Sequence, residues 1–191
     1  MRSLLAPDFD LVDVVEDGRA LVEAARMLRP DVIVADIAMP HLNGIEALVQ
    51  LRQEGDRVRV VFLTMHRDVA YARRALDAGA SGFVLKHSAP AELVTAIRAA
   101  LAGKTYLTPQ LAGEVLDSMK EGPERAADPI ASLTPRQRQV LQLLAEGRSA
   151  KEIASSLTIS ARTVEFHKYQ IMETLGLRTN AELTHFAIKH G

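Results

Sequence analysis

The chain has 191 residues, of which 48% are hydrophobic and 25% are charged, and its formal net charge is −1 at pH 7. This length predicts two domains of about 100 and 60 residues, and the lack of a signal-peptide pattern or of any apolar run near the roughly 20 residues of a membrane span predicts a cytoplasmic protein. Because the sequence has no cysteine, thiol chemistry and thiolate zinc sites are excluded. The six histidines lack metal-ligand spacing such as H-E-x-x-H, which argues against a metalloenzyme, and we expect no enzyme.

Short apolar runs alternate with helical patterns over residues 1–105. The runs, which predict strands, lie at 31–35, 59–63 and 82–85. The helical patterns lie at 44–54, 68–78 and 91–102. This alternation is typical of an α/β domain with a parallel sheet.

Three chemically distinct side chains stand where the predicted strands end: Asp36, Thr64 and Lys86. In parallel sheets, functional residues collect beyond the carboxyl ends of the strands. A carboxylate, a hydroxyl and an ammonium at one edge predict a phosphoryl site, in which Asp36 is the nucleophile, Lys86 offsets charge and Thr64 donates to a phosphoryl oxygen. The alternative is a purely structural role for Asp36.

Residues 106–130 are less regular and are interpreted as a linker with a short helix. Thr108-Pro109 is a helix-start signal, and apolar residues continue the helical pattern to Met119. The polar, Pro- and Gly-bearing stretch 121–129 predicts an interdomain linker of about ten flexible residues. A linker that only tethers the domains is the simpler alternative.

Residues 131–191 predict a small helical domain with short turns. Thr134, Ser149 and Ser160 each stand where a helix N-cap is expected, and Pro135 and Gln137 strengthen the first of these signals. The last helix is expected to start at Asn180. Short helices separated by such turns are typical of a helix-turn-helix.

The third of these helices has one apolar and one polar face at 100° per residue. Val164, Ile171 and Leu175 are predicted to point inward. Residues pointing outward are Arg162, Phe166, Tyr169 and Glu173. Such a face can enter a DNA major groove, although it is also compatible with the solvated face of a small helical bundle.

The net charge also differs between the two predicted domains. From residue 131 onward there are eight basic and five acidic residues, a balance of +3, whereas the remainder has 15 basic and 19 acidic residues, a balance of −4. A contact with double-stranded DNA is therefore expected only from the C-terminal domain.

The motifs LTPRQRQVL, GRSAKEIA and SARTVEFH resemble the LuxR-type helix-turn-helix of bacterial transcription factors. The resemblance covers about the last 60 residues. It implies base-edge or backbone contacts from Glu165, Phe166 and Tyr169. It implies phosphate contacts from Lys151, Thr163, His167 and Lys168.

The motifs VIVADIAMPHLNG, LTMH and GASGFVLKH resemble the receiver domain of two-component response regulators, which has a flavodoxin-like fold. The resemblance implies a phosphoacceptor at Asp36, a switch aromatic at Phe83, bound Mg²⁺ and a sensor histidine kinase as partner. It also implies that phosphorylation moves Thr64 and Phe83 and reshapes the face containing the helix at 91–102.

The pattern of this family begins with a strand and an acidic pair that this chain lacks. Residues 1–5 resemble the end of the first receiver helix and residues 11–15 resemble the second strand, so about 20 to 25 residues of the pattern are absent. Mg²⁺ held by Asp36 without the pair is expected to bind weakly. Glu16 and Asp17 are acidic neighbours that follow the second strand.

Three explanations of this departure stay open: a start at an internal methionine, a natural degenerate receiver that works without phosphate, or a sheet completed by another chain. We expect a transcriptional regulator that binds promoter DNA as a homodimer. Leu183 and Ala187 are the expected dimer contact, unless they only close the helical bundle. The alternative functions are a phosphorylation-independent regulator and an inhibitory heterodimer partner without its own promoter.

Overall fold

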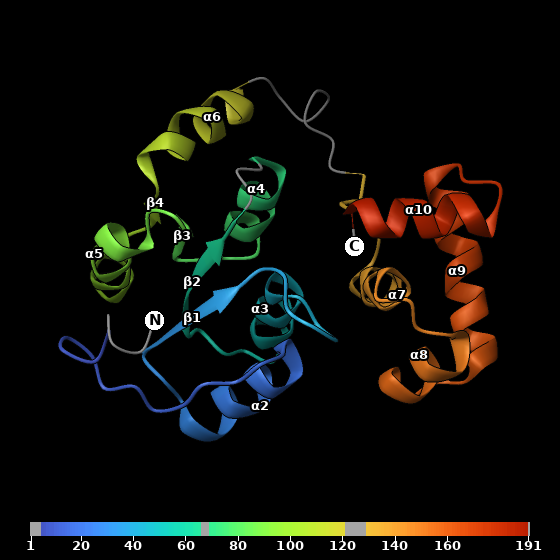
Figure 1. The fold of residues 1–191 in the computed structure, drawn as a ribbon, viewed down its shortest axis with the longest axis horizontal. Coiled ribbons are helices and arrows are strands. Elements are labelled where there is room, and N and C mark those ends of the chain that lie inside the picture. Colours follow the sequence, from blue (N-terminus) through green and yellow to red (C-terminus); the bar gives the residue numbers. More distant parts are fainter. Residues whose placement is uncertain (1–4, 66–68, 121–128, 191) are drawn as a thin grey trace. The chain divides into compact units, whose positions relative to one another are not determined.

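The computed structural model describes residues 5–65, 69–120 and 129–190. The chain divides into two compact units, an N-terminal α/β unit and a C-terminal helical unit (Figure 1). None of the helices in these described ranges is both long and apolar enough to cross a membrane.

The α/β unit is built on a parallel four-stranded sheet with the order β1-β2-β3-β4. Its strands are β1 (Val32–Asp36), β2 (Arg59–Thr64), β3 (Gly82–Leu85) and β4 (Tyr106–Leu107). The first three match the predicted strands to within one residue, and every residue of β3 is buried. Continuous burial is expected for parallel strands that are covered on both faces.

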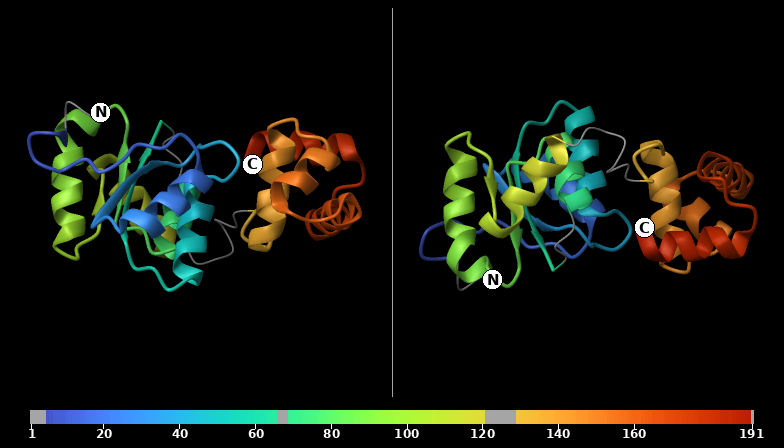
Figure 2. Two further views of the ribbon diagram at one scale, coloured as in Figure 1. Left: turned by 90° about the horizontal axis from the view of Figure 1, so that it is seen from below. Right: turned by 90° about the horizontal axis from the view of Figure 1, so that it is seen from above.

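Within the described residues, five helices accompany the sheet: α2 (Gly18–Leu28), α3 (Gly44–Gln53), α4 (Val69–Asp77), α5 (Ala89–Leu101) and α6 (Pro109–Lys120). Figure 2 shows α5 on one side of the sheet, with α2 and α3 on the other. Leu5 is buried on the α5 side, where it belongs to a core cluster with Leu63, Val84 and Leu93. The two layers of helices explain why the strands carry apolar side chains on both faces.

The predicted strand at 11–15 does not form, which corrects the sequence analysis. This segment has no regular structure, and Leu11, Val12 and Val14 are 42%, 58% and 50% exposed. A strand needs a neighbour to hydrogen-bond, and in the described part of the chain β1 is the edge of the sheet, with no strand beyond it. An apolar composition alone therefore does not order these residues.

The C-terminal end of the α/β unit also differs from the prediction. The short strand β4 was not predicted. Together with α6, which was predicted as the short helix of a linker over residues 106–130, it belongs to this unit. The backbone N–H of Thr108 donates to the carbonyl of Phe83 at 3.1 Å, which continues the ladder between β3 and β4. Residues 121–128 of the predicted interdomain linker lie outside the described residues.

The helical unit contains α7 (Pro135–Ala145), α8 (Ala150–Leu157), α9 (Ala161–Leu175) and α10 (Asn180–His190). Its N-caps form as predicted. Thr134 and Ser149 each make a reciprocal capping box, and the hydroxyl of Ser160 accepts from the backbone N–H of Thr163 at 3.0 Å. Val164 and Ile171 are fully buried in the core, with Leu175 partly buried against it.

Candidate functional site

Asp36 is the last residue of β1, and the loop that follows it contacts both its backbone and its carboxylate. The N–H of Gly44 donates to the carbonyl of Ile37 at 2.9 Å, and the N–H of Ala38 donates to the Asp36 carboxylate at 3.3 Å. A side chain at position 44 would collide with this loop, because a Cβ there would lie 2.3 Å from the Asp36 carbonyl oxygen. Glycine at position 44 therefore permits the approach of α3 to the end of β1.

Lys86 and Thr64 stand at the same edge of the sheet as Asp36. The Lys86 ammonium forms an ion pair with the Asp36 carboxylate, and both side chains are about one-third exposed. The backbone N–H of Lys86 donates to the carbonyl of Thr64 at 2.8 Å, which places these two residues side by side. Thr64 is 4% exposed. The three side chains predicted for a phosphoryl site thus lie at the carboxyl ends of β1, β2 and β3.

Phe83 lies inside the sheet rather than at this edge. It pairs with Phe62 on one side and Leu107 on the other, and its side chain is fully buried. A role as a switch aromatic would therefore require this ring to move from the position described.

The resemblance to receivers also implies Mg²⁺, and the described residues do not fit such a site. They contain no group of three or more His, Cys, Asp or Glu side chains that could hold a metal ion. Asp17 is used elsewhere, because its carboxylate accepts from the backbone N–H groups of Arg19 and Ala20 as the N-cap of α2. A single carboxylate beside an ammonium is a poor ligand set for a hard divalent cation.

In the helical unit, α8 and α9 are joined by the tight turn of a helix-turn-helix. Thr158 ends α8 in a left-handed conformation with φ 54°, and Ser160 begins α9 two residues later. The outward face of α9 matches the prediction, since Phe166 and Tyr169 are 55% and 64% exposed and Arg162 is exposed beside them. Large exposed rings on a polar helix face are typical of a binding surface.

Glu165 lies on the flank of this face and is paired with Lys168. The Lys168 ammonium is 3.1 Å from each oxygen of the Glu165 carboxylate. The Glu165 side chain is 55% exposed, whereas that of Lys168 is 17% exposed. DNA contacts were predicted for both residues but their pairing was not, although the i,i+3 spacing of their opposite charges is a signal for it.

The other predicted phosphate contacts differ in accessibility. Lys151 is exposed on α8, whereas Thr163 and His167 are half-buried on α9. The Thr163 hydroxyl shares a 2.8 Å hydrogen bond with that of Ser160. Burial, and secondarily the positive charge of Arg136, lower the pKa of His167, which favours a neutral imidazole.

The predicted dimer contact is wrong in its residues. Leu183 and Ala187 are 1% and 0% exposed and belong to the core of the helical unit, so they close the bundle as the alternative stated. The outward side of α10 carries Ile188, which is 69% exposed. A helix that lies between a core and solvent turns its most apolar face toward the core of its own domain.

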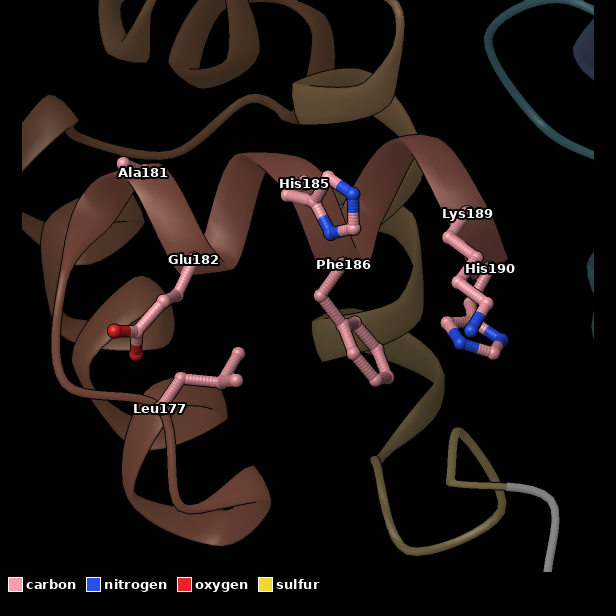
Figure 3. A pocket seen from close by; sticks show the side chains of 7 residues that line it. All are labelled: Leu177, Ala181, Glu182, His185, Phe186, Lys189 and His190. Carbon is pink, nitrogen blue, oxygen red and sulfur yellow. The ribbon is translucent and has the colours of Figure 1, made fainter.

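An open groove of about 450 Å³ runs along α10 (Figure 3). The side chains of Leu177 and Phe186 lie on the same side of α10 in Figure 3, and the Phe186 ring lies against that of His190 in a tilted arrangement with ring centroids 4.5 Å apart. The remaining lining residues are Ala181, Glu182, His185 and Lys189. This groove lies on α10 and includes none of the residues of the outward face of α9.

Comparison with known proteins decides the family. The response regulator receiver domain matches residues 1–98, and the family of bacterial regulatory proteins of the luxR type matches residues 131–187. The chain is a response regulator with a LuxR-type DNA-binding domain. It is 33% identical over 174 residues to the response regulator UvrY of Escherichia coli, an alignment that covers 91% of this regulator and 79% of UvrY.

Two solved structures extend this relationship to the whole regulator. RcsB from Salmonella enterica serovar Typhimurium, bound to the promoter rprA in the presence of phosphomimetic BeF3⁻, has a TM-score of 0.63 and 27% identity, with 98% of this regulator and 90% of that chain covered. A structure of two RcsB dimers bound to two parallel DNAs has a TM-score of 0.57 and 26% identity, covering 100% and 91%. The regulator is therefore a transcription factor of a two-component system.

Proposed function

We propose that this regulator binds promoter DNA as a dimer through α9 and that phosphorylation of Asp36 controls this binding. The ion pair between Lys86 and Asp36, beside Thr64, carries the proposal for the α/β unit. The promoter, the phosphomimetic and the dimers named for RcsB support the proposal by analogy. Promoter binding would place the regulator in the cytoplasm.

The proposed phosphorylation is a displacement at phosphorus. An oxygen of the Asp36 carboxylate attacks the phosphoryl group of a sensor kinase phosphohistidine, and the bond from phosphorus to the imidazole nitrogen breaks as the P–O bond forms. The Lys86 ammonium offsets the charge of the phosphoryl oxygens, and the Thr64 hydroxyl donates to one of them. Both groups already stand at the ends of neighbouring strands.

The response to phosphorylation is proposed to follow β3. A phosphoryl group on Asp36 competes for the Lys86 ammonium that now pairs with the carboxylate. Thr64 and Phe83 then move, and the face that contains α5 changes shape. This sequence of events is the switch implied for receivers, placed on the residues of this chain.

In the helical unit, the outward face of α9 is proposed to enter the major groove. Arg162, Glu165, Phe166 and Tyr169 would contact base edges or the backbone, while Lys151, Thr163 and His167 would contact phosphates. Because one short helix reads only a half-site, a dimer is expected. We place the dimer contact on the outward side of α10, around Ile188, in place of the buried residues.

Phosphate uptake tests the first half of the proposal. The regulator and an Asp36→Asn variant are incubated with acetyl phosphate and Mg²⁺ and compared by intact mass and Phos-tag electrophoresis. One added phosphate in the wild type and none in the variant is the expected result. A folded chain without phosphate, or with phosphate in both forms, would contradict control through Asp36.

Gel-shift titration tests the second half. Basic side chains that neutralise DNA phosphates release bound counterions, so the affinity of the protein for DNA falls steeply as the salt concentration rises. The regulator is titrated into promoter DNA from its own operon at two salt concentrations, with and without acetyl phosphate. We expect binding that weakens with salt and that acetyl phosphate strengthens in the wild type but not in Asp36→Asn. Binding that acetyl phosphate does not affect would show that DNA recognition is independent of Asp36.

A further inference from the structure

The side chains of Glu165 and Lys168 form an ion pair on the flank of the outward face of α9. Their three-residue spacing puts them about 60° apart around the helix, with Glu165 nearer to the stripe that contains Arg162 and Tyr169. The carboxylate is mostly open to solvent, whereas the ammonium lies against the flank of the helix. The Glu165 carboxylate is thus open to solvent, and the Lys168 ammonium on the flank of the helix offsets its charge.

This pairing makes an acidic side chain compatible with a DNA groove. A lone carboxylate near phosphates is repelled, whereas one that contacts an ammonium through both oxygens at 3.1 Å presents little net charge. An exposed pair of this kind adds little to helix stability. Its main effect is to hold the carboxylate in one orientation, and lone pairs that Lys168 does not use can accept further hydrogen bonds.

The chemistry of a carboxylate selects one base in the major groove. A carboxylate only accepts hydrogen bonds, and cytosine offers an N4 amine there without a neighbouring acceptor. Guanine offers two acceptors and thymine offers O4 and a methyl group, so both repel or fail to pair with a carboxylate. Adenine has an amine but also the N7 acceptor, which an amide matches better than a carboxylate.

We infer that Glu165 reads a cytosine in each half-site and that Lys168 is the positioning residue that presents its carboxylate. The inference rests on the proposed entry of α9 into the major groove. It gives Lys168 a role other than a phosphate contact. A phosphate contact contributes equally to every sequence, whereas a positioning residue affects the preference for one base.

The experiment selects binding sites from random duplex DNA with the full-length regulator and sequences them. The variants are Glu165→Gln, Lys168→Met and Lys168→Arg. Glu23→Gln is the control, because it removes an exposed carboxylate from α2 in the other unit. Fluorescence anisotropy then compares the selected duplex with one in which the invariant C·G pair is replaced by T·A, at two salt concentrations. Circular dichroism follows the thermal unfolding of every variant.

The wild type, Lys168→Arg and Glu23→Gln are expected to bind the cytosine duplex about tenfold more tightly than the thymine duplex. Glu165→Gln and Lys168→Met are expected to bind both duplexes about equally, with unchanged thermal unfolding. Lys168→Met is also expected to have no further effect on this ratio when Glu165→Gln is already present.

Two results would overturn the inference while DNA binding by the regulator stands. One is a selected site without an invariant cytosine, or a cytosine preference that survives Glu165→Gln. The other is an equal loss of affinity for both duplexes in Lys168→Met together with a smaller salt dependence, which would identify a phosphate contact. Failure of the wild type to select any duplex would contradict the proposed function itself.

Discussion

The side-chain hydroxyl of Thr108 accepts a hydrogen bond from the backbone N–H of Leu85 at 3.1 Å. The Thr108 carbonyl, which would be the next acceptor in a parallel ladder, instead accepts from Leu111 and Ala112 in the first turn of α6. The hydroxyl therefore takes the place of the carbonyl at the point where β4 becomes α6. It ties the start of α6 to the residue before Lys86.

Replacing Thr108 with valine is expected to destabilise the α/β unit by about 1–3 kcal/mol, because the fully buried hydroxyl also donates to Glu92 at 2.8 Å. Without it, Leu85 loses its acceptor and Glu92 a donor. Urea unfolding measures the effect, with Thr108→Ser as the control that keeps the hydroxyl. Equal stability of the two variants would show that water satisfies these groups.

Gly44→Ala is expected to destabilise the α/β unit by about 1–3 kcal/mol. The added Cβ would lie 2.3 Å from the Asp36 carbonyl oxygen and 2.8 Å from a ring carbon of Phe62, so backbone must shift. The matched control is Gly113→Ala in α6, where nothing lies within 4 Å of the new Cβ; it is expected to gain about 0.5–1 kcal/mol. If both substitutions changed the thermal unfolding temperature by the same amount, the close approach of α3 to the end of β1 at Gly44 would be contradicted.

The stability of the helical unit is expected to fall as the solution becomes acidic. Burial, then the charge of Arg136, lower the pKa of His167 below its ordinary value of 6.5. A basic group whose pKa is lower in the folded state than in the unfolded state stabilises the fold fully at pH values above its ordinary pKa. This stabilisation is lost as the pH falls through the ordinary pKa toward the lowered one. His167→Gln should show a flatter dependence of unfolding free energy on pH between about 7.5 and 5 than the wild type.

His87→Gln is the control for this measurement, because His87 is exposed and lies in the other unit. The pH dependence of the helical unit should remain as in the wild type. A slope that is unchanged in His167→Gln would assign the acid sensitivity to other groups.

The two sides of α10 are expected to respond differently to substitution. Leu183→Ala removes a side chain that is 1% exposed and should cost about 2–5 kcal/mol of unfolding free energy. Ile188→Asp changes a residue that is 69% exposed and should leave stability within about 0.5 kcal/mol while weakening dimerisation. Analytical ultracentrifugation and urea unfolding separate the effects, and an Ile188→Asp dimer as strong as the wild type would move the contact elsewhere.

Local chemistry explains which parts of the fold were predictable. Thr134, Ser149 and Ser160 begin helices because each hydroxyl satisfies an N–H group within the next three residues, and no distant residue is needed. The segment 11–15 has the composition of a strand but no strand to pair with in the described structure. Leu183 and Ala187 form an apolar stripe, yet periodicity does not say whether such a stripe meets its own core or a second chain.

The sequence by itself determined the family, the alternation of β1 to β3 with helices, and the convergence of Asp36, Thr64 and Lys86, because these follow from local spacing and from the rule that parallel strands end at one edge. Only the tertiary structure decided that Thr108 joins the sheet ladder and that Leu183 belongs to a core. Only it, too, showed Lys168 holding Glu165. Those outcomes depend on which groups meet in space and on the burial and hydrogen bonding that result, and no pattern along the chain records them.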